Sequence, residues 1–91
     1  MRKTVHIPTP LRKLTAEQAS VSLDADTVGD ALRQLAERFP KIQQHLFDDD
    51  GRLRSFVSVY VGDEDIRHLD RESTRLEPGA EVSIVPSIAG G

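Results

Sequence analysis

The fold is decided by one stretch of the sequence, residues 27–39, which reads TVGDALRQLAERF. Its apolar residues recur three or four positions apart, so they share one face of a helix. These residues are Val28, Ala31, Leu32, Leu35 and Phe39. Thr27 and Asp30 have the spacing of a capping box, and Pro40 stops the helix because it has no backbone N–H to donate. The pattern predicts an amphipathic helix whose single apolar stripe must lie against another layer.

Stretches of alternating apolar and polar residues lie on both sides of this helix and predict strands. The expected strands are residues 3–7, 20–23, 56–61 and 81–86, with a further short strand at 66–69. This order of elements favours an α+β fold, a mixed sheet of four to five strands with one main helix across one face. The predicted inner face of the sheet consists of Val5, Ile7, Val21, Leu23, Val57, Val59, Val61, Val82 and Ile84. The predicted outward side chains are His6, Phe56, Ser58, Tyr60, Ser83 and Val85.

The composition limits the class of protein. The chain has 91 residues, with 12 Lys and Arg against 15 Asp and Glu, and it has no cysteine. This length favours one compact domain, and the lack of thiols excludes disulfides, cysteine-ligated metals and thiol catalysis. The basic start is followed by Pro8 and Pro10 instead of an apolar segment, and no apolar run is long enough to cross a membrane. We therefore expect a soluble, cytoplasmic protein that does not bind membranes.

The sequence contains no clear motif for a metal, a phosphate or a nucleic acid. The three histidines lie in different segments without metal-ligand spacing, and the acidic run at residues 48–51 fits a solvated turn better than a calcium loop. The glycines are too far apart for a phosphate loop, and no Gly-x-Ser-x-Gly holds a nucleophilic serine. The first thirteen residues are basic but lack interleaved aromatic residues, so we expect no nucleic-acid partner. No bound metal or cofactor is expected either.

The end of the sequence, residues 87–91, belongs to no predicted element and closes with Gly90-Gly91. Glycines have no side chain, so an extended chain ending in them can pass through a narrow channel. The carboxylate of Gly91 would then sit at the tip of an arm of roughly 16 Å. If a partner adenylates this carboxylate, it becomes an acyl donor that sulfide or persulfide can attack. The plainer alternatives are a cloning remnant or an incidental end.

Three segments together resemble the MoaD/ThiS-type ubiquitin-like sulfur carriers. They are residues 56–67, reading FVSVYVGDEDIR, residues 76–86, reading LEPGAEVSIVP, and residues 88–91, reading IAGG. The resemblance covers essentially the whole chain and implies a single β-grasp domain at residues 1–86 with a flexible tail at 87–91. It also implies that an ATP-using E1-like enzyme adenylates Gly91, and that sulfur then replaces the adenylate to give a thiocarboxylate. The chain would be a carrier and not an enzyme, with ATP used only by its activating partner.

The resemblance divides the candidate site residues into a tail and a partner surface. In the tail, Gly91 carries the sulfur, and Gly90, Ala89 and Ile88 pass through the channel of the partner enzyme. Pro86 stands at the base of the tail and is also assigned to the surface that binds the partner. Alternation along the strands adds Phe56, Tyr60 and Val85 as a patch facing the partner. The alternative for this patch is a set of isolated exposed apolar side chains, which are common on protein surfaces.

Several functions remain open within this resemblance. The sequence looks most like the carriers that supply cysteine biosynthesis in actinobacteria, where a PLP-dependent cysteine synthase presents an activated serine and a metalloprotease releases the new cysteine. A second possibility is the small subunit of a molybdopterin-synthase-like enzyme. A third is a protein modifier that forms isopeptide bonds through Gly91. The last is an interaction module with an incidental Gly-Gly end.

Overall fold

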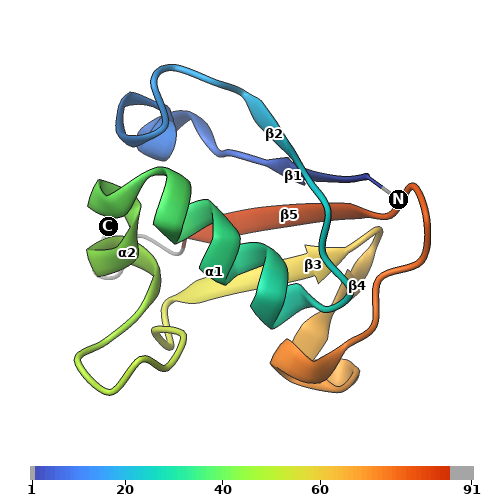
Figure 1. The fold of residues 1–91 in the computed structure, drawn as a ribbon. Helices are drawn as coiled ribbons and strands as arrows, with labels where there is room; N and C mark the ends of the chain where they lie inside the picture. Colours follow the sequence, from blue (N-terminus) through green and yellow to red (C-terminus); the bar gives the residue numbers. More distant parts are fainter. Residues whose placement is uncertain (1, 87–91) are drawn as a thin grey trace.

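The computed structural model describes residues 2–86, which form one mixed sheet with a long helix across one face (Figure 1). The strands are β1 (Lys3–His6), β2 (Ser20–Leu23), β3 (Val57–Val61), β4 (Glu64–Asp65) and β5 (Glu81–Pro86). Their order in the sheet is β2-β1-β5-β3-β4. β1 and β5 are parallel, and the other neighbouring pairs are antiparallel. The first and last strands therefore lie side by side at the centre of the sheet.

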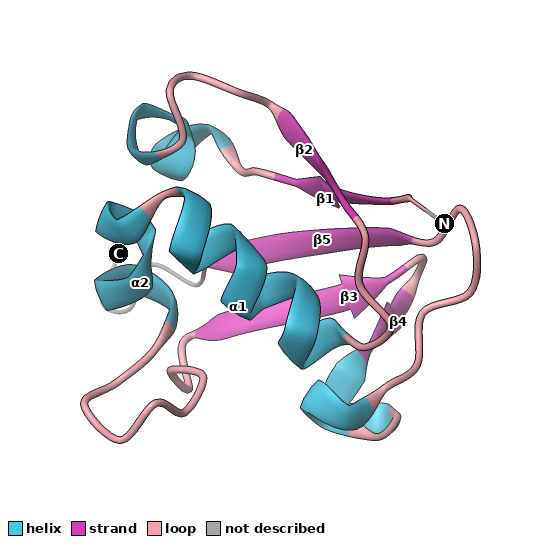
Figure 2. Ribbon diagram, viewed as in Figure 1, coloured by secondary structure: helices cyan, strands magenta, loops and turns pink. Residues whose placement is uncertain are grey.

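The long helix is α1 (Val28–Arg38), and α2 (Pro40–Leu46) follows it after a single residue (Figure 2). Within residues 2–86 three short 3-10 helices are also present: η1 (Thr9–Leu14), η2 (Ile66–His68) and η3 (Arg71–Ser73). This strand order with one helix across the sheet is the β-grasp arrangement, as predicted. Among the same residues, no helix is both long and apolar enough to span a membrane.

The core forms where the apolar stripe of α1 packs on the inner face of the sheet. The fully buried residues of this stripe are Val28, Ala31, Leu32 and Leu35. Of the nine predicted inner-face residues, all but Val61 are buried. Val61 is half-buried because it ends β3 beside the turn at Gly62, at the margin of the core. Since each buried aliphatic side chain contributes roughly 1.5–3 kcal/mol, this packing is the main source of stability.

The start of α1 is capped as the sequence predicts. The backbone N–H of Asp30 donates to Oγ1 of Thr27 at 3.1 Å. The first four N–H groups of a helix have no partner within the helix, so this bond satisfies one of them. The cap therefore sets the residue at which the helix begins.

Thr27→Ala is expected to lower the free energy of unfolding by about 1 kcal/mol, because it removes the capping oxygen. Thr27→Ser keeps that oxygen and should stay within about 0.5 kcal/mol of the parent protein. Urea denaturation of the three proteins measures the difference. Equal losses in the alanine and serine variants would show that the cap does not stabilise the helix.

The strand predicted at residues 66–69 is wrong. β4 contains only Glu64 and Asp65, and the chain then enters η2. The cause is the side chain of Asp65, whose Oδ1 accepts the backbone N–H of Arg67 at 2.9 Å and starts a helical turn. Ile66 is thereby buried in the core. The strand predicted from Phe56 also begins one residue later, because the N–H of Val57 donates to the carbonyl of Arg54 in a turn.

The acidic run at residues 48–51 forms the predicted turn. Oδ1 of Asp48 accepts the N–H groups of Arg52 and Asp50 at 3.0 and 2.9 Å. These bonds, that from Arg52 first, lower the pKa of Asp48. Gly51 has a φ of 79°, which a residue without Cβ adopts at little cost. Between residues 2 and 86, no group of three or more His, Asp or Glu side chains is placed to hold a metal ion.

Candidate functional site

The face of the sheet away from α1 carries side chains that the sequence assigns to a partner surface. Ser58 of β3 lies opposite Val85 of β5, and Tyr60 lies opposite Ser83. Val85 is 47% exposed, whereas the preceding residue Ile84 is only 2% exposed. Because side chains alternate between the two faces of a strand, Val85 points away from the core. Tyr60 is half-buried on the same face.

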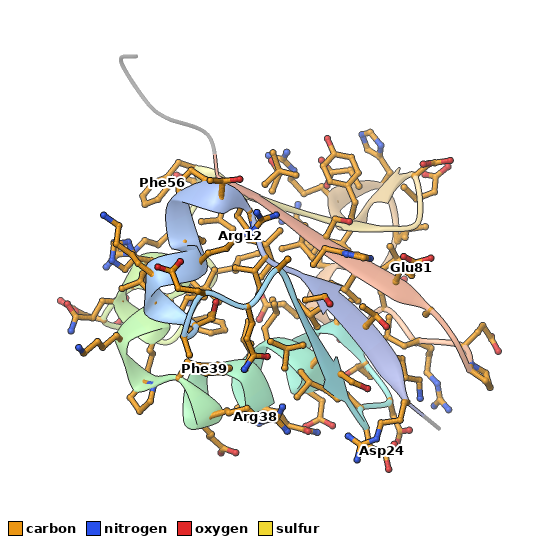
Figure 3. The ribbon with its side chains drawn as sticks, turned by 90° about the horizontal axis from the view of Figure 1, so that it is seen from above. Arg12, Asp24, Arg38, Phe39, Phe56 and Glu81 are labelled. Carbon is orange, nitrogen blue, oxygen red and sulfur yellow. The ribbon has the colours of Figure 1, made fainter. Side chains whose placement is uncertain are left out.

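Phe56 lies at the end of the sheet where β5 finishes. Its neighbour Val57 pairs with Pro86, the last residue of β5. Figure 3 shows Phe56 beside this end of the strand. Phe56 is 41% exposed. Phe56 and Val85 therefore form an exposed apolar patch, called here the β5-end patch.

Arg54 holds the ring of Phe56 in place. The guanidinium carbon of Arg54 lies 6.0 Å from the centre of the Phe56 ring, which is within the range of a cation–π contact. Nε of Arg54 also donates to the carbonyl oxygen of Gln44 in α2 at 2.8 Å. Arg54 thus connects the patch to α2, so the aromatic ring is positioned before any partner arrives.

The other half of this face is polar. Nε2 of His6 and Oε1 of Glu81 lie 2.6 Å apart, on the neighbouring strands β1 and β5. Ser83 pairs with His6 on one side and with Tyr60 on the other. The face is therefore polar near the start of β5 and apolar near its end. An apolar centre with polar surroundings is the usual composition of a protein interface.

Arg67 forms a second polar contact at the edge of this face. Nη2 of Arg67 donates to Oδ2 of Asp65 at 2.8 Å and to Oγ of Ser58 at 3.0 Å. Nε of Arg67 adds a bond to Oδ1 of Asp65 at 3.2 Å. The side-chain bonds from Arg67, followed by its backbone N–H, lower the pKa of Asp65 from its ordinary 3.8 to about 2. The pair fixes the end of β4 against β3.

Arg67→Gln is expected to move the pKa of Asp65 from about 2 back toward 3.8, because it removes the donors that favour the carboxylate. In the parent protein the pair stabilises the fold above pH 3.8, and this contribution is lost as the pH falls toward 2. Carboxyl-detected NMR titration measures both proteins. Arg75→Gln removes an equal charge elsewhere and should leave the titration of Asp65 unchanged. An unchanged midpoint in Arg67→Gln contradicts the assignment.

The structure places four of the eight predicted site residues. Phe56 and Val85 lie at the same end of the sheet, Tyr60 lies two residue pairs beyond Val85, and Pro86 pairs with Val57 through its backbone. The remaining four, Ile88, Ala89, Gly90 and Gly91, lie outside the described residues. Their roles, and the division of the chain into a domain at 1–86 and a tail at 87–91, stay predictions.

Two arginines that support this site were not identified from the sequence. Arg54 donates a hydrogen bond to the carbonyl oxygen of Gln44, ten residues earlier. Arg67 donates one to the hydroxyl oxygen of Ser58, nine residues earlier. The one local signal was the spacing of Asp65 and Arg67, since an aspartate often accepts the backbone N–H two residues later. The bonds from Arg54 to Gln44 and from Arg67 to Ser58 join different elements and could not be predicted locally.

The strand order, the helix across the sheet and the outward face beside the end of β5 define the class: a small, ubiquitin-like protein of the β-grasp fold. A model of the ThiS family matches residues 5–91. The chain belongs to the ThiS family.

Similar sequences and solved structures support this assignment. The sulfur carrier protein CysO of Mycobacterium tuberculosis is 41% identical over 93 residues that cover all of both chains. The crystal structure of that CysO has a TM-score of 0.85 at 39% identity, covering 94% of this chain and 99% of the other. A chain in the crystal structure of the Amycolatopsis orientalis BexX/CysO complex has a TM-score of 0.88 at 34% identity, covering 98% of this chain and 99% of the other. The small archaeal modifier protein 3 of Haloferax volcanii is 37% identical over 68 residues, 75% of this chain and 73% of that protein.

Proposed function

We propose that this protein is a sulfur carrier whose C-terminal Gly91 carboxylate is converted to a thiocarboxylate. The observation that carries the proposal is the 41% identity to the mycobacterial sulfur carrier over the whole of both chains. The family match also runs to Gly91, so it includes the terminal Gly90-Gly91 pair. The absence of cysteine agrees with this chemistry, because sulfur cannot be carried on a side-chain thiol.

The proposed reaction begins with activation, because a carboxylate is a poor acyl donor. An oxygen of the Gly91 carboxylate attacks the α-phosphorus of ATP, and pyrophosphate leaves. Hydrosulfide then attacks the carbonyl carbon of the acyl adenylate, and AMP leaves. The product is a thiocarboxylate, and no atom changes its oxidation state. Since adenylation consumes ATP, the reaction belongs in the cytoplasm.

The carrier contributes recognition and the reactive carboxylate, and an E1-like enzyme contributes the ATP site. The protein is therefore a cosubstrate and needs no cofactor of its own. The β5-end patch, with Tyr60 beside it, is the surface proposed to bind the enzyme, while Ile88, Ala89 and Gly90 enter its channel. The Amycolatopsis CysO in the BexX/CysO complex supports a role in which such carriers assemble with another protein.

The proposed acceptor of the sulfur is an activated serine held by a PLP-dependent cysteine synthase. The thiocarboxylate sulfur displaces the leaving group of the serine, and a metalloprotease then removes the new cysteine from the carrier. Support for this pathway comes from the similarity to the CysO sulfur carriers. Co-incubation of the sulfur-loaded carrier with the activated serine and the cysteine synthase of the same genome should give an adduct heavier than the unmodified carrier by one cysteine residue, which is cysteine minus water.

Intact-mass spectrometry tests the carrier function directly. The full chain is incubated with the E1-like enzyme of the same genome, Mg-ATP and sulfide. The expected result is a mass gain equal to replacing one oxygen by sulfur, located in the C-terminal peptide by fragmentation. Because the chain has no cysteine, no persulfide can produce a competing sulfur signal. Omission of ATP is the control, and an E1-like enzyme that adenylates the chain without any sulfur exchange would refute the proposal.

A second candidate function is protein modification through Gly91. It is supported by the 37% identity to the small archaeal modifier protein 3 over 75% of this chain. A modifier forms an isopeptide bond between Gly91 and a lysine, so conjugates of higher mass should survive reduction and denaturation. A thiocarboxylate carrier with no such conjugates, isolated from cells of its own source, would favour the carrier function alone.

A further inference from the structure

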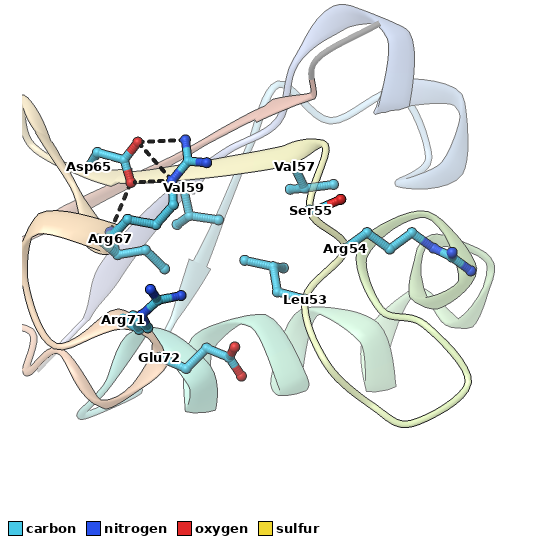
Figure 4. A pocket seen from close by; sticks show the side chains of 10 residues that line it. Leu53, Arg54, Ser55, Val57, Val59, Asp65, Arg67, Arg71 and Glu72 are labelled. Carbon is cyan, nitrogen blue, oxygen red and sulfur yellow. Dashed lines mark hydrogen bonds and ion pairs between the residues drawn. The ribbon is translucent and has the colours of Figure 1, made fainter. Parts of the chain in front are cut away.

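A second surface of the protein lies on the opposite side of β3 from β5. It contains a cavity of about 240 Å³ between β3, the segment that precedes it and η3 (Figure 4). The floor is apolar and consists of Leu53, Val57, Val59 and Ile66. Val57, Val59 and Ile66 are buried, so they form a fixed surface. This cavity does not contain any residue of the β5-end patch.

The strand that borders this cavity has an open edge. Within residues 2–86, β4 pairs only with Tyr60 and Val61 of β3. β3 is paired with β5 along its whole length on the other side. The segment from Val57 to Val59 therefore has no strand partner on the side of the cavity. Such an edge is a template to which another extended chain can add.

Three arginines line the cavity, and one of them is unpaired. Arg54 is engaged with Phe56 and Gln44, and Arg67 with Asp65 and Ser58. No hydrogen bond or ion pair of the Arg71 side chain is present within the described residues. Figure 4 shows the guanidinium of Arg71 directed into the cavity, with the carboxylate of Glu72 on the wall beside it.

We propose that this open edge of β3 binds an acidic, extended segment of a partner protein. The N–H of Val57 already donates to the carbonyl of Arg54, so the segment pairs with the backbone of β3 from the carbonyl of Val57 to Val59. It directs every second side chain toward the cavity. One of these side chains is apolar and lies over the floor, and the next is a carboxylate that pairs with Arg71. The unpaired guanidinium supports an acidic ligand: Arg67 is paired with Asp65, Arg54 is engaged with Phe56 and Gln44, and Arg71 is the arginine directed into the cavity. The recognised pattern is apolar, any residue, acidic.

The probe for this proposal is the peptide acetyl-Ser-Val-Thr-Glu-Ser-amide, titrated into the ¹⁵N-labelled full chain. We expect chemical-shift changes in the amides of residues 53–59 and 66–72, and an affinity that falls with added salt. Replacing the glutamate of the peptide by glutamine should weaken binding about fivefold, as expected for one exposed ion pair. A peptide with the glutamate moved by one residue should bind as weakly as the glutamine peptide.

Arg71→Gln tests the protein side of the same contact. This variant should bind the glutamate peptide about fivefold more weakly and should no longer distinguish it from the glutamine peptide. Arg75→Gln is the matched control, since Arg75 is exposed but does not line the cavity, and it should bind like the parent protein.

Three results would overturn the proposal. The first is the absence of shifts at millimolar peptide. The second is an equal affinity for all three peptides. The third is that another condition produces the same set of shifts without peptide. Acetate alone doing so would identify a small-anion site without strand addition. Increasing protein concentration alone doing so would identify pairing of two copies of the protein. Gly91 takes no part in this experiment, so its failure would leave the proposed sulfur chemistry intact.

Discussion

Deletion of Gly91 is expected to abolish sulfur loading of the chain, by at least about 100-fold in rate, while the fold remains intact. The deletion shortens the arm by roughly 3.5 Å, so the new terminal carboxylate of Gly90 stops short of the α-phosphorus of ATP. A misplacement of even 1 Å at a reacting centre costs about 100-fold in rate. The core consists of residues between Val5 and Ile84, so the unfolding temperature should not change.

Two further variants separate the length of the tail from its width. Ala89→Gly keeps the length and adds no bulk, so it should load sulfur like the parent protein. Gly90→Val keeps the length but places a branched side chain next to the reacting residue, so it should block the channel at the position that Gly90 occupies. Intact-mass analysis with the E1-like enzyme, ATP and sulfide measures all three variants. Full loading of the chain that lacks Gly91 would disprove the assigned reactive site.

The elements that could be predicted from the sequence are those determined by local patterns. The helix and most of the strands were predicted correctly because their signals are local. Thr27 caps the helix, the apolar residues of α1 recur on one face, and the valines of β3 alternate with polar residues. The strand expected after Asp63 was wrong because one side chain, that of Asp65, bonds to the backbone two residues later. Such a local bond competes with strand pairing, and hydrophobic alternation does not reveal it.

The candidate site could be predicted only in part. Alternation along β5 identified Val85, because a strand with both neighbours present must point every second side chain away from the core. The bond from Arg54 to Gln44 and the bridge from Arg67 to Ser58 could not be foreseen, since the partners are ten and nine residues apart. The open edge of β3 was also hidden, because it follows from the early end of β4.

The position of β5 links the fold to the proposed function. β5 pairs with β1 on one side and with β3 on the other. A central strand is held by two sets of backbone hydrogen bonds, so Pro86 at its end has a fixed position in the fold. The β5-end patch lies beside this point. A partner that binds the patch therefore also determines where residues 87–91 enter its active site.

Val85→Asp is expected to weaken the complex with the E1-like enzyme by about 30-fold or more. Val85 is 47% exposed and lies at the apolar end of the sheet face, so a partner that covers this end must bury it. Burying an unpaired carboxylate in an interface costs roughly 2–5 kcal/mol, which corresponds to about 30- to 5,000-fold in affinity. The loss should appear as a raised KM for sulfur loading with kcat nearly unchanged, because the tail itself is intact.

Two controls separate the interface from stability and from charge. Val85→Thr keeps the branched shape that favours a strand and replaces one methyl group by a hydroxyl, so it should fold normally and lose less affinity than the aspartate variant. Ser22→Asp adds the same charge on the edge strand β2, at the far side of the face from β3, and should load sulfur with an unchanged KM. Steady-state loading kinetics and thermal unfolding are measured on each variant. If Val85→Asp kept the parent KM while remaining folded, the E1-like enzyme would have to approach the carrier from another side, and the β5-end patch would lose its assigned role.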